Sequence, residues 1–253
     1  MKNKTLKKKL KKNEITIGSW ITIGHPAIAE ILSNAGFDWL TVDIEHNSID
    51  NLMVQNLIST IQSKNIAALV RVSKNEEVVI KHVLDAGADG IIVPMINTAE
   101  EAQKAVEYAK YPPIGKRGVG LSRAQNYGLG FNDYKEWVKN DLVIIAQIEH
   151  IEGVKNIQKI ISTKGIDGII IGPYDLSGSL GYPGEYERDE VKEALNKVKQ
   201  ICLKANFPLG YHVVPPDIEL LKSKIIEGYK FLAFSTDFYF MGDTAKKLMY
   251  LIK

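Results

Sequence analysis

The chain contains 253 residues, of which 45% are hydrophobic and 25% are charged, and its formal net charge is +2. These proportions are typical of a folded globular protein and exclude a disordered or fibrous chain. No apolar run approaches the ~18 residues that a membrane-spanning helix requires, so we expect no membrane partner. The small net charge gives no reason to expect a nucleic acid partner.

The chain begins with a basic segment, residues 1–14, that contains MKNKTLKKKLKK. One interpretation is a weak electrostatic attachment to RNA or to a membrane surface; the simpler one, which we adopt, is a solvated N-terminal extension. Because no apolar segment follows the lysines, we expect no secretory signal peptide. The single cysteine, Cys202, can form no internal disulfide, and together these features predict a cytoplasmic protein.

From residue 15 onward, short runs rich in Val and Ile alternate with segments whose apolar residues recur every three or four positions. The short runs predict strands, and the periodic segments predict helices. Several of the strands are apolar on both faces, which is typical of a parallel sheet covered by helices. The predicted strands comprise residues 15–23, 38–44, 67–72, 90–95, 142–149, 167–172, 207–214 and 230–236.

Eight strands with intervening helices favour a closed barrel over an open sheet. We therefore predict an α/β protein in which residues 15–253 form a single (β/α)8, or TIM, barrel domain. Two connections interrupt the alternation: residues 111–141, which contain five glycines, and residues 172–190 after the sixth strand. A connection as long as the first is usually functional in a compact domain.

Polar residues stand at the ends of several predicted strands, where reactive groups gather in barrels of this kind. The second strand ends in Asp43, which is followed by Glu45 and His46, and the third strand ends in Arg71. By the two-residue period of a strand, Asp43 and Arg71 each share a face with residues that point into the barrel. Buried charges are costly unless they are paired or coordinate a metal. These groups are therefore expected to converge on one rim.

The fifth and sixth strands supply a second polar group. Gln147 and Glu149 share one face of the fifth strand and are predicted to point into the lumen, and Asp175 follows the sixth strand. Two carboxylates from neighbouring strands suit a hard divalent cation such as Mg²⁺ or Mn²⁺, with waters and substrate oxygens completing its shell. The alternative is that each acid caps a helix or pairs with a lysine. Because the other polar groups converge on the same rim, we prefer the metal interpretation.

The remaining candidates each have two interpretations. His46 is either a surface histidine or a proton shuttle oriented by Asp43. Arg71 either neutralises a nearby acid or stabilises an oxyanion with its rigid fork of donors. Residues 172–175 form either a plain strand-to-helix turn or a source of backbone N–H groups for a substrate carboxylate. No lysine lies in the interior of a predicted strand, and Lys230 sits at the N-terminal end of the eighth. This argues against an imine-forming aldolase and leaves the electrophile's role to a metal ion.

Six segments resemble, in the same order, those of the HpcH/HpaI aldolases: GSWITIGHPAIAEILSNAGFDWLTVDIEH, LVRV, GADGIIVPM, YPPIGKRGVG, AQIE and DGIIIGPYDLSGSLGYPG. The family comprises metal-dependent aldolases of 4-hydroxy-2-oxo acids, including 2-keto-3-deoxy sugar acids. The resemblance runs from about residue 15 to the C-terminus and is strongest over residues 18–183. It implies a class II aldolase that cleaves or forms the C3–C4 bond of such an acid, giving pyruvate and an aldehyde. Oxaloacetate decarboxylation is an expected side activity.

The resemblance also implies roles for individual residues. Glu149 and Asp175 would hold a divalent cation (Mg²⁺, Mn²⁺ or Co²⁺), Arg71 would bind the keto oxygen, and Asp43 and His46 would form the acid–base pair. Residues 117–120 would lie near the aldehyde, and the chain would assemble as a homo-hexamer through its C-terminal helix. The positions implied in substrate binding are Trp20, Gln147, Gly172, Pro173, Tyr174 and Asp175.

Three features of the sequence depart from the family and leave the aldehyde unidentified, one of them being that the eighth strand continues into the aromatic residues 238–240. Tyr174 stands where the family has a small residue, and His212 lies in a region that would face the aldehyde. Two other functions also stay open. A malyl- or citryl-thioester lyase would keep the same site but would need a basic surface for CoA, for which no clear candidate exists. A non-catalytic barrel acting as a binding or assembly protein would not require the set of polar residues on the rim.

Overall fold

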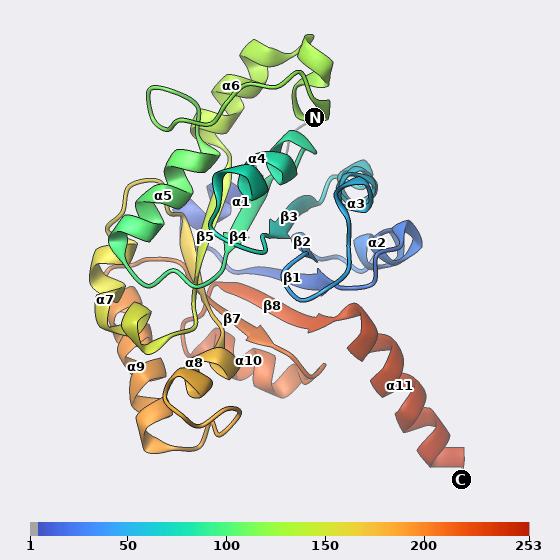
Figure 1. Ribbon diagram of the computed structural model, residues 1–253. Helices are drawn as coiled ribbons and strands as arrows, with labels where there is room; N and C mark the ends of the chain where they lie inside the picture. Colours follow the sequence, from blue (N-terminus) through green and yellow to red (C-terminus); the bar gives the residue numbers. More distant parts are fainter. Residues whose placement is uncertain (1–4, 253) are drawn as a thin grey trace.

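Among residues 5–252, which the computed structural model describes, eight parallel strands close into a barrel and each pairs with the next in chain order (Figure 1). The last strand pairs with the first, so the sheet has no free edge. The predicted single-domain (β/α)8 barrel is confirmed. The strands are β1 Thr16–Ile21, β2 Trp39–Asp43, β3 Ala67–Arg71, β4 Gly90–Val93, β5 Val143–Ile148, β6 Gly168–Ile171, β7 Leu209–Val213 and β8 Phe231–Thr236.

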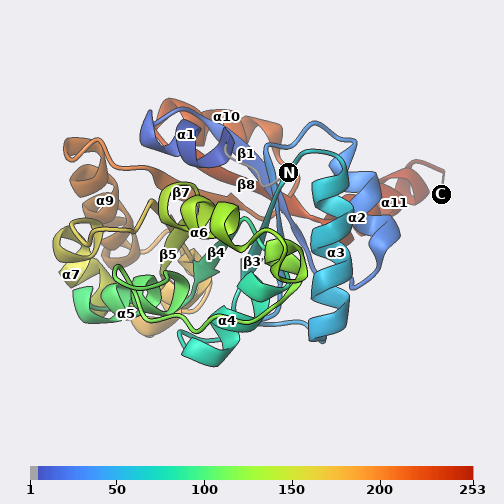
Figure 2. The same ribbon diagram turned by 90° about the horizontal axis from the view of Figure 1, so that it is seen from above.

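The helices surround the barrel, as the view from above shows (Figure 2). Most of them return the chain from the C-terminal end of one strand to the N-terminal end of the next, which is why the strands are parallel. The helices are α1 Thr5–Lys11, α2 Pro26–Ser33, α3 Asn51–Ser63, α4 Glu77–Asp85, α5 Ala99–Ala109, α6 Phe131–Asn140, α7 Ile151–Ile161, α8 Pro173–Ser179, α9 Asp189–Lys204, α10 Ile218–Ile226 and α11 Asp237–Ile252, with a 3₁₀ segment η1 at Arg123–Gly128.

The strand side chains divide into two apolar layers. Ile144 and Ala146 of β5 belong to the layer between strands and helices, whereas Val143 and Ile145 belong to the lumen. This alternation is the one predicted from the two-residue period. A glycine in β1 makes room in the lumen, because a Cβ on Gly18 would lie only 2.0 Å from the ring of Trp39.

The prediction that the basic N-terminal segment is a solvated extension was wrong for its described part. Residues Thr5–Lys11 form helix α1, and its Leu6 and Leu10 are buried with Trp39 and Phe231 of the lumen. The two leucines lie four residues apart and therefore share one face of the helix. That face covers apolar side chains at the N-terminal end of the barrel, while most of the lysines point outward. Residues 1–4 lie outside the described residues.

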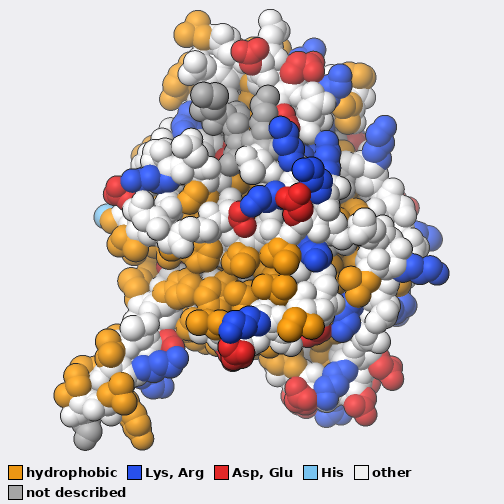
Figure 3. All heavy atoms as spheres, turned by 180° about the vertical axis from the view of Figure 1, so that it is seen from behind, with side chains coloured by type: hydrophobic (Ala, Val, Ile, Leu, Met, Phe, Trp, Pro, Cys, Tyr) orange, Lys and Arg blue, Asp and Glu red, His pale blue; other side chains and the backbone are white. Residues whose placement is uncertain are grey.

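At the other end of the chain, helix α11 leaves the barrel and projects away from it (Figure 1). Phe240, near its start, packs against Phe37 and Phe234. Its last turns carry exposed apolar side chains, among them Leu248 and Leu251, and Figure 3 shows apolar groups gathered on this arm and on the adjacent face of the barrel. No helix within residues 5–252 combines the length and the apolar character that crossing a membrane demands.

Candidate active site

The C-terminal ends of β2 and β3 carry a paired acid and base. Asp43 and Arg71 are register partners in these strands, and the guanidinium donates to both carboxylate oxygens, from Nε at 2.8 Å and from Nη2 at 2.7 Å. Both side chains are largely buried. Burial by itself lowers the pKa of Arg71, but the hydrogen bonds and negative charge of Asp43 outweigh it and raise that pKa. The arginine is therefore a fixed positive charge on the rim.

Glu45 is a functional candidate that the sequence analysis did not select. Its Oε2 lies 3.1 Å from Nη1 of Arg71, so the arginine bridges two acids. Burial raises the pKa of Glu45 to about 7 against the opposing effect of Arg71, and the negative charges of Glu149, Asp43 and Asp175 reinforce the rise. The signal was available, because Glu45 follows Asp43 by two positions and an extended chain would place both on one face.

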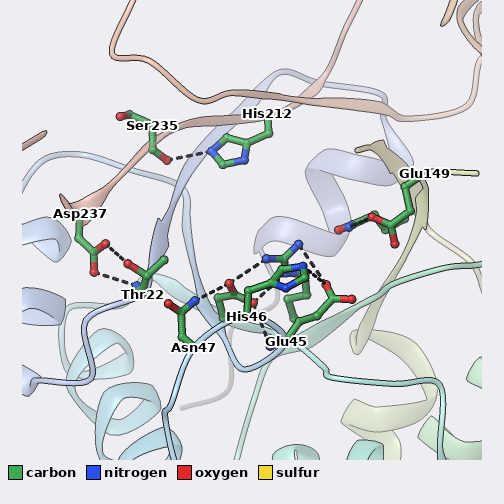
Figure 4. Close-up of polar contacts among 11 residues, drawn as sticks. Thr22, Glu45, His46, Asn47, Glu149, His212, Ser235 and Asp237 are labelled. Atoms are coloured by element: carbon green, nitrogen blue, oxygen red, sulfur yellow. Dashed lines mark hydrogen bonds and ion pairs between the residues drawn. The ribbon is translucent and has the colours of Figure 1, made fainter. Parts of the chain in front are cut away.

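His46 does not pair with Asp43 as expected. Its side chain is 63% exposed, and its Nε2 lies 3.7 Å from Oε2 of Glu45 (Figure 4). Besides Arg71, Asp43 accepts hydrogen bonds from the side chain of Asn47 at 2.6 Å and from the backbone N–H of Glu45 at 3.1 Å. The carboxylate of Asp43 is already satisfied by these donors, and the glutamate is the acid nearer to the imidazole.

Gln147 and Glu149 point into the site from the end of β5, as predicted. Glu149 is buried and accepts hydrogen bonds from the Gln147 side chain and from the backbone N–H of Met95 at 2.7 Å. Burial raises the pKa of Glu149 despite these two bonds, and the negative charge of Asp175 adds to the rise. Sequence could not single out Met95, because it contributes a backbone N–H, here positioned by a left-handed backbone with φ 53°.

Residues 172–175 form the start of α8 directly beside Glu149. Gly172 is the residue before the helix, and a Cβ at this position would lie 2.9 Å from Oε2 of Glu149. Asp175 lies in the first turn but does not cap the helix, since the capping position is occupied by Gly172 and no side chain caps it. Tyr174 does not fill the space near the acids: its exposed ring meets that of Tyr186 edge-on at 5.3 Å.

The two acids suit a divalent cation. Both present hard oxygen donors, and neither forms an ion pair with a Lys, Arg or His within the described part of the chain. Their mutual repulsion contributes to the raised pKa of Glu149, and a bound cation would relieve it. A cluster of three or more His, Cys, Asp and Glu ligands does not occur among residues 5–252, so substrate and water oxygens would have to complete the coordination shell.

Trp20 and His212 complete the rim on the side of β1 and β7. The Trp20 ring is buried, and the Arg71 guanidinium carbon lies 4.6 Å from its centroid. The imidazole of His212 stacks on the same tryptophan with a centroid separation of 5.3 Å. Trp20, predicted to line the site, therefore contacts its main positive charge.

Within residues 5–252, two lysines, Lys7 and Lys110, are buried, but they lie at the opposite end of the barrel. Lys7 of α1 pairs with Asp167 and donates to the carbonyl of Leu142 at 2.9 Å, at the N-terminal ends of β6 and β5. Lys110 follows α5 and donates to the carbonyl of Val138. Neither lysine belongs to a strand, and both lie far from the C-terminal rim. They therefore do not provide the lysine that an imine-forming aldolase needs.

Residues 117–120 were expected near the aldehyde, but within this chain Arg117 is held by residues of α4 and α6, away from the C-terminal rim. Arg117 is buried and donates to Asp85 at 2.6 Å and to the Tyr134 hydroxyl at 3.1 Å. Asp85 is the last residue of α4, which ends beside the N-terminal end of the barrel. Arg117 thus anchors the long connection and does not contact the rim of its own chain.

Residues 16–241 match the family model described as HpcH/HpaI aldolase/citrate lyase. The chain belongs to this family. It is 34% identical over 245 residues to a hydroxypyruvate/pyruvate aldolase of Roseobacter denitrificans, covering 96% of this chain and 95% of that one. It is 33% identical over 251 residues to a 2-keto-3-deoxy-L-rhamnonate aldolase of Escherichia coli K12, covering 98% and 92%.

Among solved structures, an HpcH/HpaI aldolase/citrate lyase family protein from Burkholderia cenocepacia superposes with a TM-score of 0.93 at 29% identity, covering 99% of both chains. The resemblance inferred from the sequence is confirmed, and this HpcH/HpaI chain is placed among carbon–carbon lyases, as predicted. Membership in a family of carbon–carbon lyases excludes the alternative of a non-catalytic barrel.

Proposed function

We propose that this HpcH/HpaI protein is a divalent-metal-dependent aldolase that acts on the C3–C4 bond of a 4-hydroxy-2-oxo acid. Cleavage of this bond gives pyruvate and an aldehyde, and the reverse reaction joins them. The observation that carries the proposal is the rim itself. Glu149 and Asp175, which form no ion pair with any Lys, Arg or His among residues 5–252, lie near a guanidinium that is held in place by Asp43 and Glu45. The rim therefore offers two carboxylates that could hold a metal cation and a guanidinium that could bind the anionic keto acid.

Glu149 and Asp175 are the residues that would hold the cation. Bound there, Mg²⁺, Mn²⁺ or Co²⁺ would supply a Lewis acid to the carboxylate and keto oxygens of the substrate. Glu149 is already oriented by Gln147 and by the Met95 backbone, so little reorganisation of its side chain is required on binding.

The pyruvyl end of the substrate would lie between Arg71 and the start of α8. Arg71 keeps its planar group fixed through Asp43 and Glu45, and its charge is suited to stabilise the enolate oxygen that develops as the bond breaks. Gly172 leaves open the space beside Glu149 that any larger residue would fill. Trp20, Gln147 and residues 172–175 are the proposed substrate-binding positions.

His46 is the proposed base for the 4-hydroxyl group. In the cleavage direction it accepts the hydroxyl proton, the C3–C4 electron pair moves toward the keto carbonyl, the aldehyde leaves, and C3 of the enolate is then protonated. In the structure the acid nearest to His46 is Glu45, whereas Asp43 positions Arg71. Both Asp43 and Glu45 therefore take part, the first through the arginine and the second through the imidazole. Because oxaloacetate gives the same enolate on losing CO₂, its decarboxylation is a proposed side activity.

The test is an aldol assay with pyruvate, a panel of aldehydes and Mg²⁺, Mn²⁺ or Co²⁺. Activity should disappear with EDTA, return when the metal is restored, and be lost in Glu149→Gln. The matched control is Glu152→Gln, because Glu152 is an exposed glutamate in the following helix that pairs with Lys155. Full activity of Glu149→Gln in the presence of EDTA would reject the metal site.

We further propose that the chain assembles as a homo-oligomer, a hexamer by its resemblance to the family. Helix α11 supports this, since it projects from the barrel with exposed apolar residues near its end, including Leu248, Tyr250 and Leu251. Apolar surface of this kind usually marks a contact with another chain.

A further inference from the structure

His212 is held in one orientation by contacts on two sides. Its ring stacks on Trp20 at 5.3 Å with an interplanar angle of 26°, and its Nε2 lies 3.1 Å from the backbone carbonyl oxygen of Ser235. Ser235 has a left-handed backbone with φ 56°, where the pairing of β8 with β1 shifts register. The carbonyl is thus directed at the imidazole by a local irregularity of the barrel (Figure 4).

The carbonyl contact decides which ring nitrogen carries the proton. A carbonyl oxygen only accepts hydrogen bonds, so Nε2 must be the donor and Nδ1 is left as an acceptor in the neutral ring. Burial lowers the pKa of His212 to about 4, and the positive charge of Arg71 contributes, so the ring is neutral at neutral pH. Within residues 5–252 the structure gives Nδ1 no hydrogen-bond partner, and the side chain is partly accessible.

Nδ1 of His212 lies close to the residues proposed to bind the substrate. Arg71 lies 4.6 Å from the Trp20 ring on which His212 stacks, and its charge contributes to the lowered pKa of His212, so both groups border the same tryptophan on the rim. The pyruvyl end uses the sector formed by β3, β5 and β6, whereas His212 and Ser235 belong to β7 and β8. The part of the substrate beyond C4 must extend into a sector that the pyruvyl end leaves free.

We propose that Nδ1 of His212 binds a hydroxyl group carried by the aldehyde part of the substrate, so that the site selects hydroxylated aldehydes. A hydroxyl group donates to the neutral acceptor. An alkyl group leaves Nδ1 unpaired, and a carboxylate brings lone pairs against it with no proton to donate. This inference rests on the proposed aldolase function and names the substrate class of that site, which neither the comparisons nor Tyr174 determines.

The experiment compares three aldehydes with pyruvate and Mg²⁺: glycolaldehyde, its near-isostere propanal, and the carboxylated succinic semialdehyde. In the wild type, kcat/KM should be highest for glycolaldehyde. His212→Phe keeps an aromatic ring on Trp20 but has no acceptor, and the ratio of glycolaldehyde to propanal should fall about tenfold. His212→Gln restores an acceptor and should recover part of the ratio. Tyr211→Phe, on the adjacent residue that packs outward against Tyr229, should leave the ratio unchanged.

The outcomes separate the two proposals. An unchanged ratio in His212→Phe, or an equal loss with both aldehydes, overturns the role of His212 while the aldolase function stands. A wild-type preference for succinic semialdehyde also overturns it. If the wild type forms no product with any aldehyde, the aldolase proposal fails and this one fails with it. Thermal melting of each variant establishes that the ratios describe folded protein.

Discussion

Arg71 and Asp43 occupy directly paired positions on β3 and β2, and two parallel hydrogen bonds of 2.8 and 2.7 Å join the guanidinium to the carboxylate. The pairing register places the two side chains together, and the two hydrogen bonds fix the orientation of the planar guanidinium. They therefore also fix the direction of its remaining N–H donors. One of these donors reaches Glu45 at 3.1 Å. The arginine is thus positioned before any substrate arrives, which is the condition for electrostatic stabilisation of an enolate.

The first prediction concerns this fork. Arg71→Lys keeps the charge but cannot make two parallel bonds to Asp43 or lie flat on Trp20. We expect kcat for aldol cleavage to fall by about 10²–10³-fold, with secondary structure retained by circular dichroism. Arg188→Lys, at an exposed arginine between α8 and α9, is the control and should behave as the wild type. A lysine variant within threefold of wild-type kcat would contradict the assigned role.

The second prediction concerns the space beside Glu149. In Gly172→Ala the new Cβ would lie 2.9 Å from Oε2 and 3.0 Å from Cβ of Glu149, so the acid must shift. We expect the affinity for Mn²⁺, measured by calorimetry, to fall by about tenfold or more. In Gly178→Ala, in the same helix, the nearest atom to the new Cβ is 3.9 Å away, and affinity should be unchanged. Equal affinities in the two variants would disprove the close contact.

The third prediction is a pH dependence of stability in the metal-free protein. The pKa of Glu45 is raised to about 7 in the fold, above its ordinary value of 4.5, so the folded state binds more protons than the unfolded state between these values. The free energy of unfolding therefore falls as pH rises from 4.5 to 7. Glu45→Gln removes this loss, and its stability relative to the wild type should rise by at most about 1.4 kcal/mol per pH unit in that window. Urea titrations with EDTA measure it; a relative stability that stays flat or falls with pH would refute the raised pKa.

The fourth prediction concerns the N-terminal helix. Leu10 is buried against the lumen residues Trp39 and Phe231, so Leu10→Ala would leave a cavity at the N-terminal end of the barrel. We expect the free energy of unfolding in urea to fall by about 2–5 kcal/mol. Lys12→Ala, whose parent side chain is 72% exposed, should change it by less than about 0.5 kcal/mol. If the two variants were equally stable, α1 would not belong to the folded core.

The fifth prediction tests assembly through α11. Introducing charge at two exposed apolar positions, with Leu248→Glu and Leu251→Glu together, should dissociate the oligomer in light scattering. Lys246→Glu, on the same helix, changes charge without adding it to an apolar position and should leave the mass unchanged. A wild type that is monomeric at micromolar concentration would refute the assembly proposal itself.

Most of the fold and the acids of the site could be predicted because their signals are local. Alternation of Val- and Ile-rich runs with helical periods indicated the barrel, and the two-residue period placed Gln147 and Glu149 in the lumen. The pairing of His46 with Glu45 could not be predicted, because it depends on which hydrogen-bond donors occupy the carboxylate of Asp43. Those donors include Asn47 and the backbone of Glu45, and their reach is set by the loop after β2.

The sequence by itself determined the class of fold, the strand ends that carry charge, and the family, since each depends on residue order along short segments. Only the tertiary structure decided that a lysine-rich segment seals the lumen with Leu6 and Leu10, that Arg71 bridges two acids, and that His212 presents Nδ1 as an acceptor. These depend on contacts between residues far apart in the chain. Pairing of β7 with β8 sets the carbonyl of Ser235 against the imidazole of His212, 23 positions earlier, and closure of the barrel between β8 and β1 brings Trp20 beside the same ring.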